Sequence, residues 1–192
     1  MNRVYLLLGS NMGNREVLME SACGLLIERL LPDYLEVEDL SEAVNTSEMY
    51  ETEAWGFESE TKFLNMAFVT LTEYEPVEIL EICKEIEREL GREDVDDARA
   101  YDGNGKRIYS ARPIDIDIIF FDRENGGTGE GGKKVFEPQV VELEELKIPH
   151  PLMQERMFVL DPLSDIAGDY SHPVLKKSVR ILRKELKTNK RS

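Results

Sequence analysis

The sequence predicts an α+β fold with a ferredoxin-like core, in which an antiparallel-rich sheet is covered by helices. Two observations lead to this class. The expected elements follow the order strand, helix, strand, strand, helix, strand, and a hairpin and further helices come after them. The 192 residues contain no internal repeat and suit one domain of ordinary size. We therefore expect residues 1–192 to form a single domain, with residues 187–192 as a frayed tail.

The first strand and the first helix are marked by a change of hydrophobic period. Val4–Leu8 is a short apolar run that ends at Gly9, which predicts a central strand. Asn14 is the expected N-cap of the following helix, whose apolar residues recur at helical spacing as far as Leu30. The turn between them lacks the Gly-x-Gly-x-x-Gly spacing of a dinucleotide site, so we interpret it as a tight turn.

The core continues with two strands and a second long helix. Residues 37–50 alternate weakly and predict an irregular strand, whereas residues 51–62 predict a loop. Phe63–Leu71 is strongly apolar and predicts a strand. Pro76 suits the first helical position, and Gly91 suits the end of the same helix.

The remaining segments are a long loop, a hairpin and a final helix. Residues 92–111 are charged and without period, and we expect them to form a lid. Gly127–Lys134 nearly matches the phosphate-loop pattern, but a lysine stands in the Ser/Thr position and no helix is predicted after it. We therefore favour a flexible hairpin tip over a phosphate loop. A helix is predicted for residues 178–187.

The strand of residues 112–121 contains the strongest candidate site. Strand alternation places on one face Ile114, Ile116, Ile118 and Phe120, and on the other face Asp115, Asp117, Ile119 and Phe121. The Cα atoms of the two aspartates should lie roughly 6 to 7 Å apart. Both carboxylates can then reach two cations spaced about 3.5 to 4 Å apart, which predicts a metal site. The alternative is a solvated strand face that carries two charges.

Five other residues are candidates, each with a second interpretation. Arg92 and Arg112 stand at the two ends of the predicted lid and can meet a phosphate, although surface arginines are the alternative. Asn65 can hydrogen-bond a heterocycle or be satisfied by neighbouring backbone. Trp55 can cover a planar ligand or pack on the core. His150 lies between two prolines, where its imidazole can face a ligand or cap a turn.

Composition excludes several classes of partner. The 24 basic and 39 acidic residues give a net charge of −15, which repels a polyanion, so we expect no nucleic-acid partner. No run of about 18 apolar residues and no signal peptide are found, so we expect no membrane contact and a cytoplasmic location. Cys23 and Cys83 fall in helical apolar patterns and are expected to be buried thiols.

Five short blocks occur in order between Val4 and about Leu186. They are Gly9-Ser10-Asn11; Tyr50-x-Thr52 with Gly56 and Phe63-Leu64-Asn65-x-Ala67; Gly91-Arg92; Arg112-Pro113-Ile114-Asp115-Ile116-Asp117; and Pro149-His150 with Arg156-x-Phe158-x-Leu160-x-Pro162-Leu163. Each block is modest alone, but their joint order is specific. Together they resemble the 6-hydroxymethyl-7,8-dihydropterin pyrophosphokinase family of folate biosynthesis.

The resemblance implies a Mg-dependent diphosphotransferase that moves pyrophosphate from ATP to the hydroxymethyl group of the reduced pterin and releases AMP. It implies that Asp115 and Asp117 hold two Mg2+ ions and that Arg92 and Arg112 are catalytic contacts of the triphosphate. Metal ions neutralise the charge of ATP and acidify the attacking hydroxyl, so the chemistry needs no side-chain base. The alternative is a non-catalytic pterin- or nucleotide-binding module of the same fold.

The resemblance also implies two groups of binding residues. Those for the pterin are Thr52, Trp55, Phe63, Asn65 and Phe158, and those for ATP are Glu87, His150 and Arg156. The chain departs from many family members at Tyr109, where tryptophan is common, and at Pro151, where tyrosine is common. We expect a monomer that has only small-molecule partners.

Overall fold

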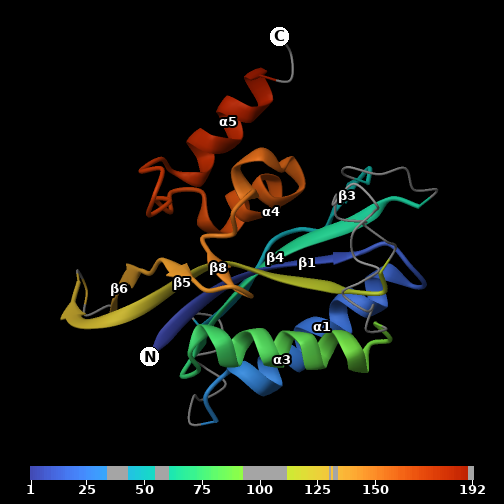
Figure 1. The fold of residues 1–192 in the computed structure, drawn as a ribbon, viewed down its shortest axis with the longest axis horizontal. Coiled ribbons are helices and arrows are strands. Elements are labelled where there is room, and N and C mark those ends of the chain that lie inside the picture. The colour runs from blue at the N-terminus through green and yellow to red at the C-terminus, as the bar shows by residue number, and fades with distance from the viewer. Residues whose placement is uncertain (34–42, 55–60, 93–111, 130, 132–133, 190–192) are drawn as a thin grey trace.

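The computed structural model describes residues 1–33, 43–54, 61–92, 112–129, 131 and 134–189 (Figure 1). Six strands form one sheet in the order β2-β4-β1-β5-β6, and β3 also pairs with β4. They are β1 (Asn2–Ser10), β2 (Val44–Thr46), β3 (Tyr50–Thr52), β4 (Phe63–Thr72), β5 (Asp115–Thr128) and β6 (Lys134–Pro138). Every pairing in this sheet is antiparallel. The predicted α+β class with a ferredoxin-like core is confirmed.

Helices cover both faces of the sheet (Figure 1). They are α1 (Arg15–Leu30), α3 (Pro76–Glu89), the 3-10 turn η4 (Met153–Glu155), α4 (Met157–Ala167) and α5 (Val179–Asn189). A two-stranded sheet, β7 (Val141–Glu142) and β8 (Lys147–Ile148), lies before η4. Among the helices of the described ranges, none is long and apolar enough to cross a membrane.

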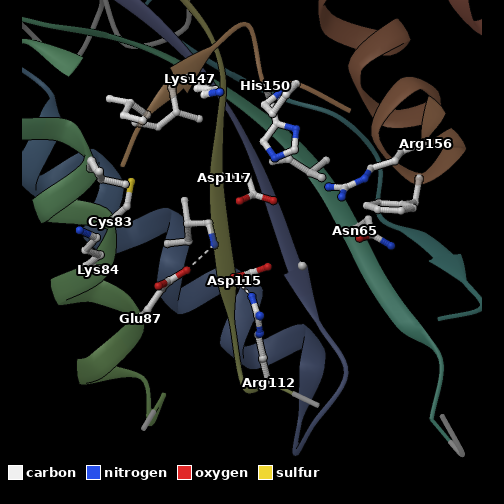
Figure 2. A pocket seen from close by; sticks show the side chains of 18 of the residues that line it. Asn65, Cys83, Lys84, Glu87, Arg112, Asp115, Asp117, Lys147, His150 and Arg156 are labelled. Carbon is white, nitrogen blue, oxygen red and sulfur yellow. Dashed lines mark hydrogen bonds and ion pairs between the residues drawn. The ribbon is translucent and has the colours of Figure 1, made fainter. Parts of the chain in front are cut away.

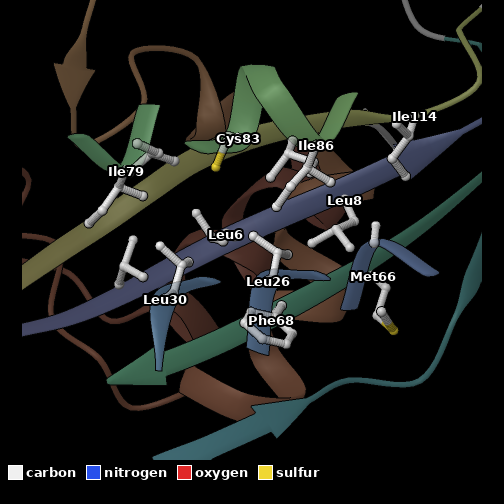
Figure 3. Close-up of a cluster of buried hydrophobic side chains, with 14 of the residues drawn as sticks. Leu6, Leu8, Leu26, Leu30, Met66, Phe68, Ile79, Cys83, Ile86 and Ile114 are labelled. Atoms are coloured by element: carbon white, nitrogen blue, oxygen red, sulfur yellow. The ribbon is translucent and has the colours of Figure 1, made fainter. Parts of the chain in front are cut away.

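The central strand β1 is apolar on both faces because both are covered. Leu6 and Leu8 pack with α1 and α3 in one core cluster, and Phe68 of β4 joins them (Figure 3). Tyr5 and Leu7 face the opposite cluster, which α4 and α5 complete. A strand covered on both faces gains from apolar residues at every position, which explains the unbroken run in the sequence.

Local signals at the helix ends behave as predicted. The Asn14 side chain accepts a hydrogen bond from the Val17 N–H at 3.4 Å, as expected of an N-cap. Pro76 is the first residue of α3, and the Glu75 N–H just before it donates to the Glu78 carboxylate at 2.8 Å. Gly91 follows α3 with φ +96°, a conformation that glycine adopts without strain.

The predicted alternation of β5 holds as far as Ile119 and is wrong from Phe120 onward. Tyr5 pairs with Phe120 but Leu6 pairs with Ile118, so Ile119 is an extra residue in β5. A β-bulge of this kind reverses the face of every later side chain. Ile119 and Phe120 therefore both pack on the α4–α5 side, and Phe121 packs on the α1–α3 side.

Several boundaries also differ from the predictions. β3 occupies Tyr50–Thr52, so it begins at the last residue of the predicted irregular strand and extends two residues into the range predicted as a loop. β5 continues to Thr128, beyond its predicted end at Phe121, and it forms the predicted hairpin with β6. Lys134 begins a strand, which excludes the phosphate-loop interpretation. The last helix extends to Asn189, beyond its predicted end. The expected lid at residues 93–111 lies outside the described residues.

A buried tyrosine–aspartate pair joins the segment after α4 to the sheet. The Tyr170 hydroxyl donates to Asp122 Oδ1 at 2.5 Å, and the Tyr170 ring stacks on Phe120 at a centroid distance of 4.3 Å. Asp122 is only 3% exposed. Burial raises the pKa of the Asp122 carboxyl, and the hydrogen bond from Tyr170 only partly opposes this shift.

This raised pKa gives a pH-dependent stability. A carboxyl whose pKa is higher in the folded state stabilises the fold below its unfolded pKa and loses that contribution as pH rises through the folded value. Asp122→Asn should therefore become more stable relative to the parent protein between pH 4 and pH 7. Urea unfolding midpoints of both proteins at the two pH values measure this difference. The same change at Asp169, whose side chain is 91% exposed, is the control. A parent-to-variant difference that is the same at both pH values contradicts the assignment.

Candidate functional site

One cavity of about 470 Å³ gathers the predicted site residues (Figure 2). It lies over β1, β4 and β5, between α3 on one side and the start of α4 on the other. The predicted residues that line it are Thr52, Phe63, Asn65, Glu87, Arg92, Arg112, Asp115, Asp117, His150, Arg156 and Phe158. Trp55 lies outside the described residues. Residues that are far apart in the sequence are therefore brought together in one hollow.

The floor of the cavity is a row of three neighbouring strand positions. Gly9 of β1 pairs with Asn65 of β4 on one side and with Asp115 of β5 on the other. All three positions point to the same face of the sheet. A Cβ atom added at Gly9 would lie 3.4 Å from Asn65 Oδ1, so the glycine keeps the space between the two polar side chains open. Gly9 was not among the predicted site residues, although its place at the end of the apolar run was an available signal.

Asp115 and Asp117 project from β5 toward the cavity (Figure 2). Asp115 Oδ1 accepts from Arg112 Nη1 at 2.5 Å and from Arg92 Nη1 at 2.9 Å. Arg92 and Arg112, the predicted phosphate contacts, therefore both bind Asp115, a predicted metal ligand. Burial works against the charge of Arg112, but the neighbouring carboxylates outweigh it and leave the pKa of Arg112 raised.

Glu87 reaches the same place from α3. Its side chain is 6% exposed, Oε1 accepts the Ile116 N–H at 2.6 Å, and the other oxygen pairs with Arg92. Burial raises the pKa of Glu87 to about 7, with a further contribution from Asp115, whereas Arg92 and the Ile116 N–H oppose the shift. The contact with Ile116 was not predicted. A signal was present, because Glu87 follows Cys83 by four residues and so falls on the buried stripe of α3.

The opposite end of the cavity combines an amide with aromatic rings. Asn65 is 3% exposed, and its Nδ2 donates to Thr52 Oγ1 of the adjacent strand β3 at 2.8 Å. Its partner is thus a hydroxyl rather than the neighbouring backbone considered from sequence. Phe63 of β4 and Phe158 of α4 also line the cavity. This end has the flat apolar surfaces and the single fixed amide that suit a planar heterocycle.

His150 and Arg156 complete the wall between β5 and α4. The His150 N–H donates to the carbonyl of the bulged Ile119 at 3.1 Å, and His150 Nδ1 accepts the Leu152 N–H at 3.4 Å. His150 thus caps a local turn and also lines the cavity, and its contact with a ligand stays a prediction. Arg156 is 7% exposed, and its guanidinium lies 5.8 Å from the centroid of the Phe158 ring.

The acidic residues of the site suit a hard divalent ion such as Mg2+. Within the described residues, no three His, Cys, Asp or Glu side chains are grouped to hold a metal. Asp115 and Asp117 supply hard carboxylate oxygens on one strand face. Mg2+ is commonly bound by one or two carboxylates, with waters and substrate phosphates completing its octahedron. The two aspartates fit Mg2+ that arrives with a phosphate ligand and not a cage made of protein alone.

Sequence comparison identifies relatives of known type. A family model described as 7,8-dihydro-6-hydroxymethylpterin-pyrophosphokinase (HPPK) matches residues 5–168. The 2-amino-4-hydroxy-6-hydroxymethyldihydropteridine pyrophosphokinase of Porphyromonas gingivalis is 39% identical over 170 residues, which cover 88% of this chain and 93% of that protein. The Bacillus subtilis protein of the same name is 36% identical over 165 residues, covering 86% and 78% of the two chains.

Solved structures support the fold. Wild-type HPPK-DHPS of Plasmodium falciparum, crystallised with pterin and p-hydroxybenzoate, matches with a TM-score of 0.61 at 19% identity. The match covers 99% of this chain and 44% of that one. A second HPPK-DHPS structure, in complex with substrates, gives a TM-score of 0.61 at 17% identity, covering 100% and 44% of the two chains. This chain thus spans less than half of the solved chains, and at these identities the likeness concerns the fold.

Proposed function

The chain belongs to the 7,8-dihydro-6-hydroxymethylpterin-pyrophosphokinase family, and on this basis we propose that it transfers pyrophosphate from ATP to the hydroxymethyl group of 6-hydroxymethyl-7,8-dihydropterin. The products are the pterin diphosphate and AMP, and the reaction belongs to folate biosynthesis. One observation carries the proposal beyond the family match. A single cavity contains Asp115 with both of its arginine partners at one end and Asn65 with aromatic rings at the other.

The acceptor occupies the end of the cavity lined by the aromatic rings. The pterin stacks between Phe63 and Phe158, since both rings line this end and flat faces suit a bicyclic heterocycle. Asn65 hydrogen-bonds the pterin edge, and its bond to Thr52 fixes the direction of the amide. Trp55 is proposed to cover the same ligand. The hydroxymethyl group then points toward the Asp115–Asp117 row.

The nucleotide occupies the other end, between α3 and the segment before His150. The triphosphate lies over Asp115, where Arg92 and Arg112 can leave the carboxylate and bind phosphate oxygens. His150 and Arg156 stand on the opposite wall and hold the phosphates from that side. Arginine suits this role because its planar guanidinium donates two parallel hydrogen bonds to phosphate.

Catalysis in this arrangement depends on position and charge. Two Mg2+ ions held by Asp115 and Asp117 would neutralise the triphosphate and acidify the attacking hydroxyl. The side chains hold the hydroxymethyl oxygen and the leaving AMP oxygen in line with the β-phosphorus. Glu87 needs no role as a base in this arrangement, because the metal ions would acidify the hydroxyl, and its two oxygens contact Arg92 and the Ile116 N–H.

We further propose a cytoplasmic monomer that acts on small molecules alone. The net charge of −15 disfavours the binding of nucleic acid, because a long polyanion would extend beyond the cavity onto the acidic surface. Sedimentation at micromolar concentration distinguishes a monomer from a dimer.

Analysis of the products tests the proposed reaction. With ATP, Mg2+ and the hydroxymethyl dihydropterin, the protein should release AMP and form the pterin diphosphate. Chromatography of the reaction mixture measures both products. Asp115→Asn and Asp117→Asn should each lower kcat by about 100- to 1,000-fold, as expected when a preorganised charge is removed. Asp169→Asn, at an exposed position, should match the parent protein. Release of ADP alone contradicts pyrophosphoryl transfer, and pterin binding without turnover would favour the non-catalytic alternative.

Substitutions at Gly9 test whether the floor of the cavity needs open space beside Asn65. Gly9→Ala should raise KM for the pterin several-fold and Gly9→Val by about tenfold or more, because methyl groups would enter the space beside Asn65. KM for ATP should change less. Gly24→Ala is the matched control, since a Cβ at Gly24 meets nothing within 4 Å. Equal effects at the two glycines, or an unchanged pterin KM in Gly9→Val, contradict this description of the floor.

A further inference from the structure

Among the described residues, no strand pairs with the first part of β5 on the side away from β1. β5 pairs with β1 from Asp115 to Arg123, but its pairing with β6 begins only at Asp122. The segment Asp115–Ile118 is therefore an open sheet edge, where backbone groups need other partners. The partner of the Ile116 N–H is Glu87 Oε1 at 2.6 Å. A side chain of α3 thus takes the place of the missing strand, midway between the two aspartates.

The same carboxylate holds an arginine. The second oxygen of Glu87 pairs with Arg92, and Arg92 Nη1 also lies 2.9 Å from Asp115 Oδ1. Glu87 is only 5% exposed, and a buried carboxylate is tolerated where both oxygens have such partners. Glu87 therefore contacts the backbone between Asp115 and Asp117, and it also contacts Arg92, which is hydrogen-bonded to Asp115.

We propose that Glu87 is a positioning residue: it holds the β5 segment that carries Asp115 and Asp117, and it keeps Arg92 on Asp115 until metal and triphosphate bind together. The inference rests on the proposed function for the identity of these ligands. It differs from the direct ATP contact that the family resemblance implies for Glu87, because both carboxylate oxygens already contact protein groups.

The exchange of partners explains why the two ligands should bind together. Asp115 Oδ1 accepts from two guanidinium groups, so a metal ion alone would approach a carboxylate whose charge is already compensated, beside two positive charges. A triphosphate gives the arginines new oxygen partners and frees the carboxylate. Each ligand therefore lowers the cost of binding the other, and the coupling is reciprocal.

Two substitutions separate the two contacts of Glu87. Glu87→Gln keeps an oxygen for the Ile116 N–H but presents an NH2 group to Arg92. Glu87→Ala removes both contacts. Glu85→Gln is the matched control, because Glu85 is exposed on the same helix and the change of charge is equal. The measurements are hydrogen exchange of the Ile116 amide in the ligand-free protein, and Mn2+ binding by EPR in the presence of a non-hydrolysable ATP analogue.

Exchange at Ile116 should be at least about tenfold faster in Glu87→Ala and close to the parent rate in Glu87→Gln. Mn2+ affinity in the presence of the analogue should fall about tenfold in Glu87→Ala and clearly less in Glu87→Gln. Glu85→Gln should change neither quantity.

Three results would overturn the proposal. They are an unchanged Ile116 exchange rate in Glu87→Ala, an unchanged Mn2+ affinity in Glu87→Ala, and an equal loss of Mn2+ affinity in both Glu87 variants, which would indicate a direct ligand role for the charge. If Glu87→Ala does not fold, faster Ile116 exchange in Glu87→Gln overturns the tether by itself. Failure of the proposed function is distinguishable, because it appears as absence of AMP from the parent protein whatever the Ile116 exchange rate is.

Discussion

The site depends on the placement of two like charges, Asp115 and Asp117, on one face of a strand whose other face is packed in the core. Ile114, Ile116 and Ile118 bury that other face against α1 and α3. The strand cannot rotate to turn both carboxylates away from the cavity without exposing the isoleucines. Carboxylates fixed in this way need positive partners, and Arg92 and Arg112 provide them for Asp115. The packing of the isoleucines in the core thus determines that Asp115 and Asp117 face the cavity.

The bulge at Ile119 lets one strand serve two packing arrangements. Before it, β5 turns its carboxylates to the cavity and its isoleucines to α1 and α3. After it, Phe120 faces the α4–α5 cluster, where Tyr170 stacks on it. The Ile119 carbonyl accepts the His150 N–H, so the irregular position also anchors the wall of the cavity opposite α3. Bulges beside functional sites commonly redirect side chains in this way.

Patterns of period, capping and alternation predicted β1, β4, α1, α3 and the shared face of the aspartates, because these features are encoded locally. The extra residue at Ile119 could not be predicted, since an apolar run looks the same with or without a bulge. Three-residue β3 is too short to give a period, and it is stabilised by its pairing with β4. The bond from Glu87 to Ile116 joins a helix to a strand edge 29 positions away, which only the tertiary fold defines. Trp55 and residues 93–111 lie outside the described residues.

The charge of the cavity explains how an acidic protein can accept ATP. The chain has 39 acidic and 24 basic residues, yet among the described residues the cavity is lined by six acidic and five basic side chains. This part of the lining is therefore nearly neutral, and divalent ions bound there would make it positive. Charges beyond about 8 Å are largely screened at physiological ionic strength. A single nucleotide inside the cavity responds mainly to the local balance, whereas a long polyanion spans the acidic surface and is repelled. Discrimination between ATP and nucleic acid then follows from the size of the ligand relative to the screening length.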